Sequence, residues 1–301
     1  MSAKILDGKK LSGEIAEKLK LKVSKLKVKP SLAIIQVGDL PQSSSYIERK
    51  KNYGANIGAT VHHIMLPEKV SEKKILELIT ELNLRKDIHG IIVQLPIPKN
   101  LNTPKILEAI DPMKDVDGLH SHNAFLMYEG SIGNTNGKDI PRGLAPATAK
   151  GIVTLLKANS VDLVGKKVLV IGRSLLVGKP TVMLMLGENA TVTIAHNYTN
   201  DLDKLCKEHD IIVVAVGKAG LIGKKALKKG HIVVDVGTNS VGGPKTLEEI
   251  SKKKLVGDVV FDEAIKIVSA ISPVPGGVGP MTVASLFENL LDAHAMQKNS
   301  R

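Results

Sequence analysis

VLVIGRSLLVGKP, residues 168–180, is an apolar run that leads directly into a turn with two glycines. A buried parallel strand followed by such a turn brings the chain to a helix start, where backbone N–H groups and the helix dipole attract phosphate. The turn differs from the general fingerprint Gly-x-Gly-x-x-Gly because Ser174 stands in place of the second glycine. Taken alone, the stretch is compatible with a phosphate-binding turn and with a turn that has no ligand.

Around this stretch, apolar runs alternate with helical patterns. The sequence predicts strands at residues 167–171, 190–194, 211–216, 232–236 and 255–257, with helices between several of them. Such alternation is typical of a parallel sheet covered by helices, so we expect an α/β domain. Two of these strands end in Val216-Gly217 and Val236-Gly237, whose glycines either let a cofactor approach the backbone or only form turns.

The first half of the chain alternates in a similar way. Helices are predicted at 11–28, 43–57 (with Ser43, Ser44 and Ser45 as N-caps) and 71–84, and strands at 31–37, 60–66 and 88–93. A loop with Gly130, Gly133, Gly137, Pro141 and Gly143 then separates the halves, and the domain boundary is expected near 146–151. A helix at 148–158 follows the boundary, and a last helix is expected at 283–296. With 301 residues, the chain is long enough for two domains.

The composition is that of a globular protein, with 43% hydrophobic and 24% charged residues. The net charge of +12 comes from lysines in small groups without interleaved aromatic residues, which favours anionic small molecules over nucleic acid as ligands. Cys206 is the only cysteine, so neither an intrachain disulfide nor a cysteine-based zinc site is possible. Residues 1–10 have no apolar core of signal-peptide length, and no apolar run approaches the length of a membrane span. A cytoplasmic protein is expected, with an organellar form trimmed of its transit peptide as the alternative.

Three polar residues of the first half are candidates for chemistry. Tyr46 and Lys50 are four residues apart in a predicted helix, which puts the phenol and the ammonium on one face. A solvated lysine beside a half-buried tyrosine is the alternative. Gln94 directly follows a predicted strand, at the sheet edge where ligands bind in open α/β folds.

An acidic segment follows, with Asp111, Asp115 and Asp117 before a glycine. It lacks the spacing and the downstream glutamate of a calcium loop, so we expect no metal site here. Asp111 and Asp115 are interpreted as caps of turns, and Asp117 is the better functional candidate. The nearby His120 and His122 are interpreted as polar surface, because they have no further metal ligands around them.

The strand after the glycine turn ends in Ala195-His196-Asn197, where an NAD-binding fold would carry an acid for the ribose hydroxyl. The absence of this acid removes repulsion against a 2′-phosphate. Arg173 and His196 can supply positive charge or hydrogen-bond donors to that phosphate. The pattern therefore favours NADP over NAD.

Five ordered motifs together resemble the methylenetetrahydrofolate dehydrogenase/cyclohydrolases of one-carbon metabolism, over nearly the whole chain. They are SYIERK (45–50), GIIVQLPIP (90–98), DVDGL (115–119), GRSLLVGKP (172–180) and PVPGGVGPMT (273–282). The resemblance implies oxidation of 5,10-methylenetetrahydrofolate with NADP and hydrolysis of the methenyl product to 10-formyltetrahydrofolate, a supply for purine biosynthesis. The alternatives are a dehydrogenase without cyclohydrolase activity, linked to NADP or to NAD, and a basic nucleic-acid or scaffold protein on a similar frame.

The resemblance also implies the domain organisation. Residues 1–148 and 280–301 would form a catalytic, folate-binding α/β domain, and residues 149–279 a Rossmann-type NADP-binding domain, with a cleft between them. Members of the family usually dimerise through the cofactor domain, so a homodimer is expected. The chain departs from the family pattern at Ala147, Ala149, Asn197 and Thr238.

Roles for individual residues follow from the resemblance. Lys50 would manage protons, Tyr46 would position the folate ring and Lys50, and Gln94 would hold Lys50. The substrate would also contact Val93, Leu95, Asp117, Pro275 and Gly276, with Asp117 binding the pterin nitrogens. The cofactor would contact Gly172, Arg173, Ser174, Val177, Gly178, Pro180, His196, Val216, Gly217, Gly237, Thr238, Gly279 and Thr282.

Overall fold

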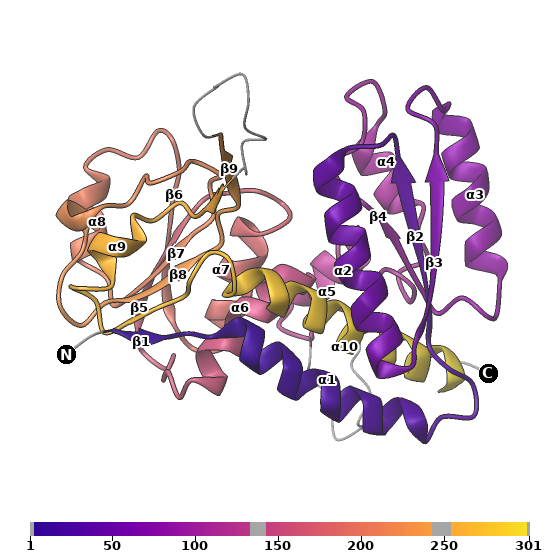
Figure 1. The fold of residues 1–301 in the computed structure, drawn as a ribbon, viewed down its shortest axis with the longest axis horizontal. Helices are drawn as coiled ribbons and strands as arrows, with labels where there is room; N and C mark the ends of the chain where they lie inside the picture. The colour runs from indigo at the N-terminus through magenta and orange to yellow at the C-terminus, as the bar shows by residue number, and fades with distance from the viewer. Residues whose placement is uncertain (1–2, 133–142, 243–253, 300–301) are drawn as a thin grey trace, which may run out of the picture. The chain divides into compact units, whose positions relative to one another are not determined.

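The chain forms two compact α/β units, which confirms the predicted two-domain fold (Figure 1). The computed structural model describes residues 3–132, 143–242 and 254–299. One unit, here called the six-stranded unit, consists of residues 1–12 and 148–282. The other, called the three-stranded unit, consists of residues 13–147 and 283–301. Gly133, Gly137 and Pro141 of the predicted boundary loop lie outside the described residues.

The six-stranded unit is built on a wholly parallel sheet in the order β1-β11-β8-β7-β5-β6. Its inner strands are almost purely aliphatic and buried on both faces, as expected for a sheet covered by helices. The strands are β1 (Lys4–Ile5), β5 (Lys167–Ile171), β6 (Thr191–Ala195), β7 (Ile211–Val214), β8 (Ile232–Asp235) and β11 (Ala270–Ile271).

The order of these strands creates a topological switch point. After β5 the chain adds β6 on one side of β5 and then returns to add β7 on the other side. In open α/β sheets, ligands bind outside the carboxyl ends of the strands at such a point. The turn after β5, which begins with Gly172, is located there. The helices of the unit are α6 (Ala147–Ala158), α7 (Gly178–Gly187), α8 (Leu202–Lys207) and α9 (Phe261–Ala264), with a 3-10 helix η1 (Lys224–Ala226).

Two features of this unit differ from the sequence prediction. The strand expected at residues 255–257 is β10 (Lys254–Val256), but it pairs antiparallel with β9 (Asn239–Val241) outside the parallel sheet. The first residues of the chain, expected in the catalytic domain, contribute β1 to the six-stranded sheet. The backbone N–H of Lys4 donates to Ser269 O at 2.8 Å, and that of Leu6 donates to Ile271 O at 2.9 Å.

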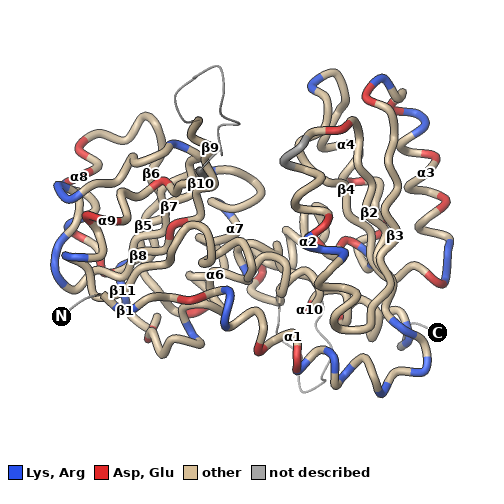
Figure 2. Tube along the Cα trace, viewed as in Figure 1, with Lys and Arg blue, Asp and Glu red and all other residues tan. Residues whose placement is uncertain are grey.

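The three-stranded unit has a parallel sheet in the order β3-β2-β4. Its strands are β2 (Ser31–Val37), β3 (Thr60–Leu66) and β4 (Gly90–Val93), and its helices include α2 (Pro41–Ile57), α3 (Glu72–Leu84), α4 (Thr103–Glu108) and α5 (Ser121–Tyr128). An aliphatic core includes Ile35, Ile79 and Ile91. Figure 2 shows basic residues interspersed with acidic ones along α3.

The starts and ends of the predicted helices are partly wrong, for local reasons. The helix α1 (Gly8–Ser24) ends four residues before the predicted end, and Lys29 Nζ donates to the carbonyl of Val23 in its last turn at 2.8 Å. The helix α2 begins at Pro41, two residues before the expected serine caps, because proline is well suited to the first helical turn. Its end is as predicted, with Gly58 in the left-handed region at φ 81°.

The last helix, α10 (Val278–Asn299), starts five residues before the predicted one. Its second part packs in the three-stranded unit, as the resemblance implies. The side chain of Asn289 donates to Val116 O at 2.9 Å and to Ala145 O at 2.8 Å, and the side chain of Gln297 donates to His89 O at 2.8 Å. These bonds tie the end of the chain to the segment that carries Asp117.

Among the described residues, no helix combines the length and the apolar character that a membrane crossing requires. The single cysteine, Cys206, is a free thiol buried in the core of the six-stranded unit. Burial raises the pKa of this thiol to about 12. A thiol with such a pKa is almost entirely protonated at neutral pH and therefore unreactive.

Candidate active site

The predicted pair Lys50 and Gln94 is in direct contact. Lys50 projects from α2 and is only 9% exposed, and its Nζ donates to Gln94 Oε1 at 3.0 Å. The other end of the amide is also held, because Gln94 Nε2 donates to Leu95 O at 2.8 Å. The carbonyl oxygen of Gln94 is thus oriented toward the ammonium, and the lysine is held rather than solvated.

Lys50 and Asp117 influence each other electrostatically. Burial lowers the pKa of Lys50, and the negative charge of Asp117 opposes this shift. Burial likewise raises the pKa of Asp117, and the positive charge of Lys50 opposes that shift. Desolvation is the larger cause in both cases, so each group is pushed toward its neutral form. A lysine of this kind populates the free amine at lower pH than a solvated one.

Tyr46 lies one turn before Lys50 on α2 and is half-buried. The guanidinium carbon of Arg49 lies 5.6 Å from the centroid of its ring, which is a cation–π contact. The sequence reasoning did not select Arg49, although its spacing from Tyr46 on a helix was a usable signal. Arg49 restricts the orientation of the phenol ring.

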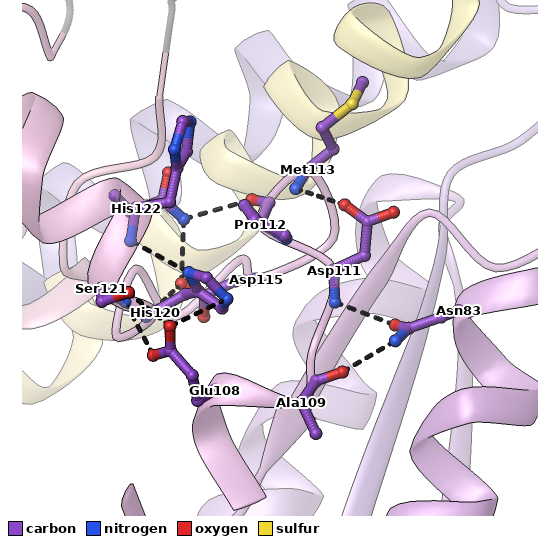
Figure 3. A network of polar contacts seen from close by, with 11 residues as sticks. Asn83, Glu108, Ala109, Asp111, Pro112, Met113, Asp115, His120, Ser121 and His122 are labelled. Atoms are coloured by element: carbon purple, nitrogen blue, oxygen red, sulfur yellow. Dashed lines mark hydrogen bonds and ion pairs between the residues drawn. The ribbon is translucent and has the colours of Figure 1, made fainter. Parts of the chain in front are cut away.

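The loop that carries Asp117 is fixed by hydrogen bonds, many of which Figure 3 shows. Asp111 Oδ1 accepts from the N–H of Met113 at 2.9 Å, and Asp115 Oδ2 accepts from the N–H of His120 at 2.8 Å. Both acids therefore cap turns, as predicted. His120 caps the start of α5 by accepting from the N–H of His122 at 3.0 Å. Within the described residues, no group of acids, histidines and cysteines is arranged to hold a metal ion.

Lys114 is a structural residue that the sequence reasoning missed. Its buried Nζ donates to three carbonyls at the end of α3, Leu82 O at 3.1 Å and Asn83 O and Arg85 O at 2.7 Å each. A cation at this position satisfies carbonyls that a helix end leaves free. Lys114 thereby ties the loop of Asp117 to α3.

We expect Lys114→Met to lower the free energy of unfolding by about 2 kcal/mol, because buried carbonyls lose their donor. The Michaelis constant for a folate substrate should rise as well, since the loop of Asp117 loses an anchor. Urea unfolding and steady-state kinetics measure the two effects. Lys73→Met, at an exposed position on α3, is the control and should leave both quantities nearly unchanged. Equal stability of the two variants would contradict the assigned role.

The other predicted substrate residues are distributed between the two units. Val93 ends β4 and is only 2% exposed, with its side chain in the core. Leu95 follows it and is half-buried. Pro275 and Gly276 belong to the six-stranded unit, in the loop after β11, where Gly276 O accepts from the N–H of Lys9 at 2.8 Å.

The predicted phosphate turn requires its glycines. A Cβ on Gly172 would lie 2.3 Å from Ala215 O, and a Cβ on Gly178 would lie 2.1 Å from Gly172 O. Ser174 holds the turn closed, because its Oγ accepts from the N–H of Val177 at 3.2 Å and of Gly178 at 3.3 Å. Pro180 is buried in the first turn of α7. This backbone cradle fits a pyrophosphate at a helix start.

Arg173 and Tyr198, which are exposed, form a cluster with the half-buried His196. The guanidinium carbon of Arg173 lies 5.6 Å from the centroid of the Tyr198 ring, and the rings of His196 and Tyr198 meet edge to face at 6.1 Å. His196 Nδ1 accepts from the N–H of Tyr198 at 3.2 Å, which leaves Nε2 as the atom that carries the proton in the neutral ring. The cluster can therefore donate to a phosphate through both Arg173 and His196.

We expect Arg173→Ala to raise the Michaelis constant for NADP by about tenfold or more, because a charge-assisted contact to the 2′-phosphate is lost. The constant for NAD, which lacks this phosphate, should change little. Lys207→Ala, which removes the same charge from an exposed site on α8, is the matched control. Equal effects of Arg173→Ala on both cofactors would remove the proposed role.

The remaining predicted cofactor residues follow β7, β8 and β11. Val216 and Gly217 are exposed after β7, Gly237 is buried after β8, and Thr238 next to it is exposed. Gly279 and Thr282 lie at the start of α10, where Thr282 Oγ1 donates to Val278 O at 3.3 Å. All of these positions belong to the six-stranded unit. The predicted cofactor residues thus lie in segments that follow the carboxyl ends of its strands.

Comparison with known proteins also divides the chain into two domains, although residues 6–12 and 283–298 fall on the other side of the division. Residues 146–298 match the family model of the tetrahydrofolate dehydrogenase/cyclohydrolase NAD(P)-binding domain, and residues 6–117 match that of the catalytic domain. The bifunctional protein FolD of Acetivibrio thermocellus is 43% identical over 300 residues, covering 99% of each chain.

Two solved structures are also similar over their whole length. The bifunctional dehydrogenase/cyclohydrolase FolD of Campylobacter jejuni has a TM-score of 0.89 at 39% identity, covering 98% of this chain and all of that one. The Trypanosoma brucei methylenetetrahydrofolate dehydrogenase-cyclohydrolase, solved with NADP and an inhibitor, has a TM-score of 0.90 at 32% identity, covering 99% of each chain.

Fold and site define an α/β protein with an NAD(P)-binding domain of doubly wound topology and a second α/β domain that carries a buried lysine. Family matches cover most of the chain, and whole-length relatives exceed 40% identity. The chain belongs to the tetrahydrofolate dehydrogenase/cyclohydrolase family.

Proposed function

We propose that the protein oxidises 5,10-methylenetetrahydrofolate with NADP and hydrolyses the resulting 5,10-methenyltetrahydrofolate to 10-formyltetrahydrofolate. The two solved structures that match the whole chain are named as methylenetetrahydrofolate dehydrogenase/cyclohydrolases. The observation that carries the proposal is the buried Lys50, whose Nζ is held by Gln94. Burial lowers the pKa of Lys50, and the negative charge of Asp117 only partly offsets this shift. An isolated surface lysine would not have its pKa lowered in this way.

The hydrolysis needs a group that accepts a proton as water adds to the methenyl carbon. Burial lowers the pKa of Lys50, so its amine is available for this step at lower pH than an ordinary lysine. Gln94 fixes the position of Nζ, and Tyr46 packs beside the folate ring. Asp117 binds the donor groups of the pterin, which a carboxylate accepts well. The substrate further contacts Val93, Leu95, Pro275 and Gly276.

The six-stranded unit binds NADP, which accepts the hydride when bound. The turn of Gly172 and Gly178 supports this assignment, because its backbone segments pack too closely for any Cβ and lead directly into the start of α7, where N–H groups bind phosphate. Arg173 and His196 bind the 2′-phosphate, and Ser174 keeps the turn closed. The other cofactor contacts are Val177, Pro180, Val216, Gly217, Gly237, Thr238, Gly279 and Thr282.

An absorbance assay tests the function directly. The protein is mixed with methylenetetrahydrofolate and either NADP or NAD, and reduced cofactor and methenyl intermediate are followed together. We expect reduction of NADP and only transient methenyl product. Accumulation of methenyl product would instead indicate a dehydrogenase without cyclohydrolase activity. No reduction of either cofactor, together with salt-dependent binding of DNA, would favour a nucleic-acid protein.

The assembly and location are part of the same proposal. We propose a homodimer formed through the six-stranded unit, because β6 is the edge strand of its sheet and Ile194 on β6 is 40% exposed. Light scattering after size-exclusion chromatography measures the mass, and a monomer at assay concentration would contradict the proposal. A buried free thiol at Cys206 suits a reducing compartment, so we propose that the protein acts in the cytoplasm in the supply of purine biosynthesis.

A further inference from the structure

Two buried carboxylates lie among the loops that follow β7 and β8. Asp235 is the last residue of β8 and is 4% exposed, and Asp258 follows β10 and is 0% exposed. Asp235 Oδ1 accepts from the backbone N–H of Asp258 at 3.0 Å, so the two residues are directly linked. Neither residue was selected from the sequence as part of a site.

Asp258 bonds to two loops at once. Its Oδ2 accepts from the backbone N–H of Val216 at 2.8 Å and of Gly217 at 2.9 Å. Its Oδ1 accepts from the side-chain Nδ2 of Asn239 at 2.8 Å. Gly217 has φ 70°, a conformation that needs such fixing. The carboxylate therefore sets the backbone after β7 and the residue next to Thr238 in a single arrangement.

Asp235 stabilises the same loops through further hydrogen bonds. Its carboxylate accepts from the N–H of Gly237 at 2.9 Å and from the N–H of Val259 at 2.9 Å. The backbone makes room for both acids through glycines. A Cβ on Gly237 would lie 2.3 Å from Asp258 Oδ1, and a Cβ on Gly257 would lie 1.8 Å from Asp235 Oδ2.

Two adjacent buried acids are costly for stability. Burial raises the pKa of Asp235 to about 6, even though backbone N–H groups act in the opposite direction. Turns of this length can close without any buried charge. The presence of two buried acids therefore points to a need for fixed loop geometry at the carboxyl ends of these strands. The loops that they fix are those predicted to contact the cofactor.

We infer that Asp258 is a positioning residue for the dinucleotide: it holds Val216-Gly217 and the Thr238-Asn239 segment in the geometry that binds NADP. The inference rests on the proposed function. It assigns Asp258 no contact with the cofactor and no part in the chemistry. Because, among the described residues, its side-chain oxygens bond only to the loops after β7 and β8, which are predicted to contact the cofactor, we expect an effect on cofactor affinity and not on the folate site.

The variant Asp258→Asn tests this inference. An amide cannot accept on both sides, so its NH₂ group must face either the two backbone N–H groups or the NH₂ of Asn239. We expect the Kd for NADP, measured by calorimetry, and the Michaelis constant for NADP to rise about tenfold or more. The kcat and the hydrolysis of methenyltetrahydrofolate supplied without cofactor should change less than about threefold, since chemistry is not touched. Asp262→Asn, the same change at an exposed position nearby, is the control.

A double variant separates positioning from simple loss of stability. In Asp258→Asn with Asn239→Asp, the amide oxygen at 258 can accept from Val216 and Gly217 while its NH₂ donates to the new carboxylate. We expect this exchange to recover most of the NADP affinity. Unchanged affinity in Asp258→Asn, or an equal loss of folate hydrolysis, would overturn the inference. A wild-type protein that binds no NADP would instead reject the proposed function.

Discussion

Lys50→Met is expected to abolish the hydrolysis of methenyltetrahydrofolate, with a loss of about a hundredfold or more, while the oxidation of methylenetetrahydrofolate continues. Methionine fills the space of the lysine stem but can neither accept nor release a proton. Hydride transfer depends mainly on the placement of substrate and cofactor, so it should lose much less. Methenyl product should therefore accumulate in the absorbance assay, which is not expected for the wild type.

The same variant carries its own control for folding. Burial lowers the pKa of Lys50 below its value in the unfolded chain, so its charged form costs stability at neutral pH. This cost disappears in Lys50→Met, while Gln94 loses a donor and Asp117 loses a compensating charge, so the melting temperature should stay close to that of the wild type. Lys51→Met, at the next and partly exposed position of α2, is the matched comparison. Undiminished hydrolysis in Lys50→Met would refute the proton role.

Gly178→Ala should weaken NADP binding by about a hundredfold, equivalent to roughly 3 kcal/mol. The added Cβ would lie 2.1 Å from Gly172 O, with further backbone atoms at 2.5 and 2.8 Å, so the turn after β5 must open. The donors of the helix start then move away from the pyrophosphate. Calorimetric titration with NADP measures the loss of affinity.

The helix α7 provides its own control for this change. Gly187, at the other end of the helix, has nothing within 4 Å of an added Cβ. Gly187→Ala should therefore leave NADP binding unchanged. Hydrolysis of methenyltetrahydrofolate supplied directly should also persist in Gly178→Ala, because Lys50 and Gln94 belong to the other unit. Normal NADP affinity in Gly178→Ala would reject the cradle as the pyrophosphate site.

Long apolar patterns made most of the sheet predictable. The strands β2, β3 and β5 have the predicted limits. In β2 and β5, continuous aliphatic runs mark strands that are buried. The two-residue strands β1 and β11 have too few residues to form a pattern, and only pairing at a distance defines them. For this reason, the sequence did not predict that Lys4 and Ile5 join the six-stranded sheet. The antiparallel pairing of β10 with β9 likewise depends on contacts that no local pattern contains.

Candidate residues at strand ends were predictable because of their position and chemistry, as the contact of Lys50 with Gln94 illustrates. Buried charged residues with structural roles were not predictable from the sequence. Lys114 and Asp258 lie in segments that resemble ordinary polar loops, and a single sequence gives charged residues a high expectation of exposure. A weak signal existed for the acids, since glycines flank both Asp235 and Asp258 closely along the chain. Only the structure shows that Gly237 and Gly257 are needed because a Cβ there would collide with the carboxylates of Asp258 and Asp235.

Each unit consists of two separate pieces of the chain. Residues 1–12 join the six-stranded unit, and residues 283–301 join the three-stranded unit. During synthesis, the three-stranded unit is therefore the first to be nearly complete and the last to be finished. Its loop carbonyls at Val116 and Ala145 receive their donor only when Asn289 has left the ribosome. The catalytic half of the enzyme must thus wait for the whole cofactor half to be translated before its own structure closes.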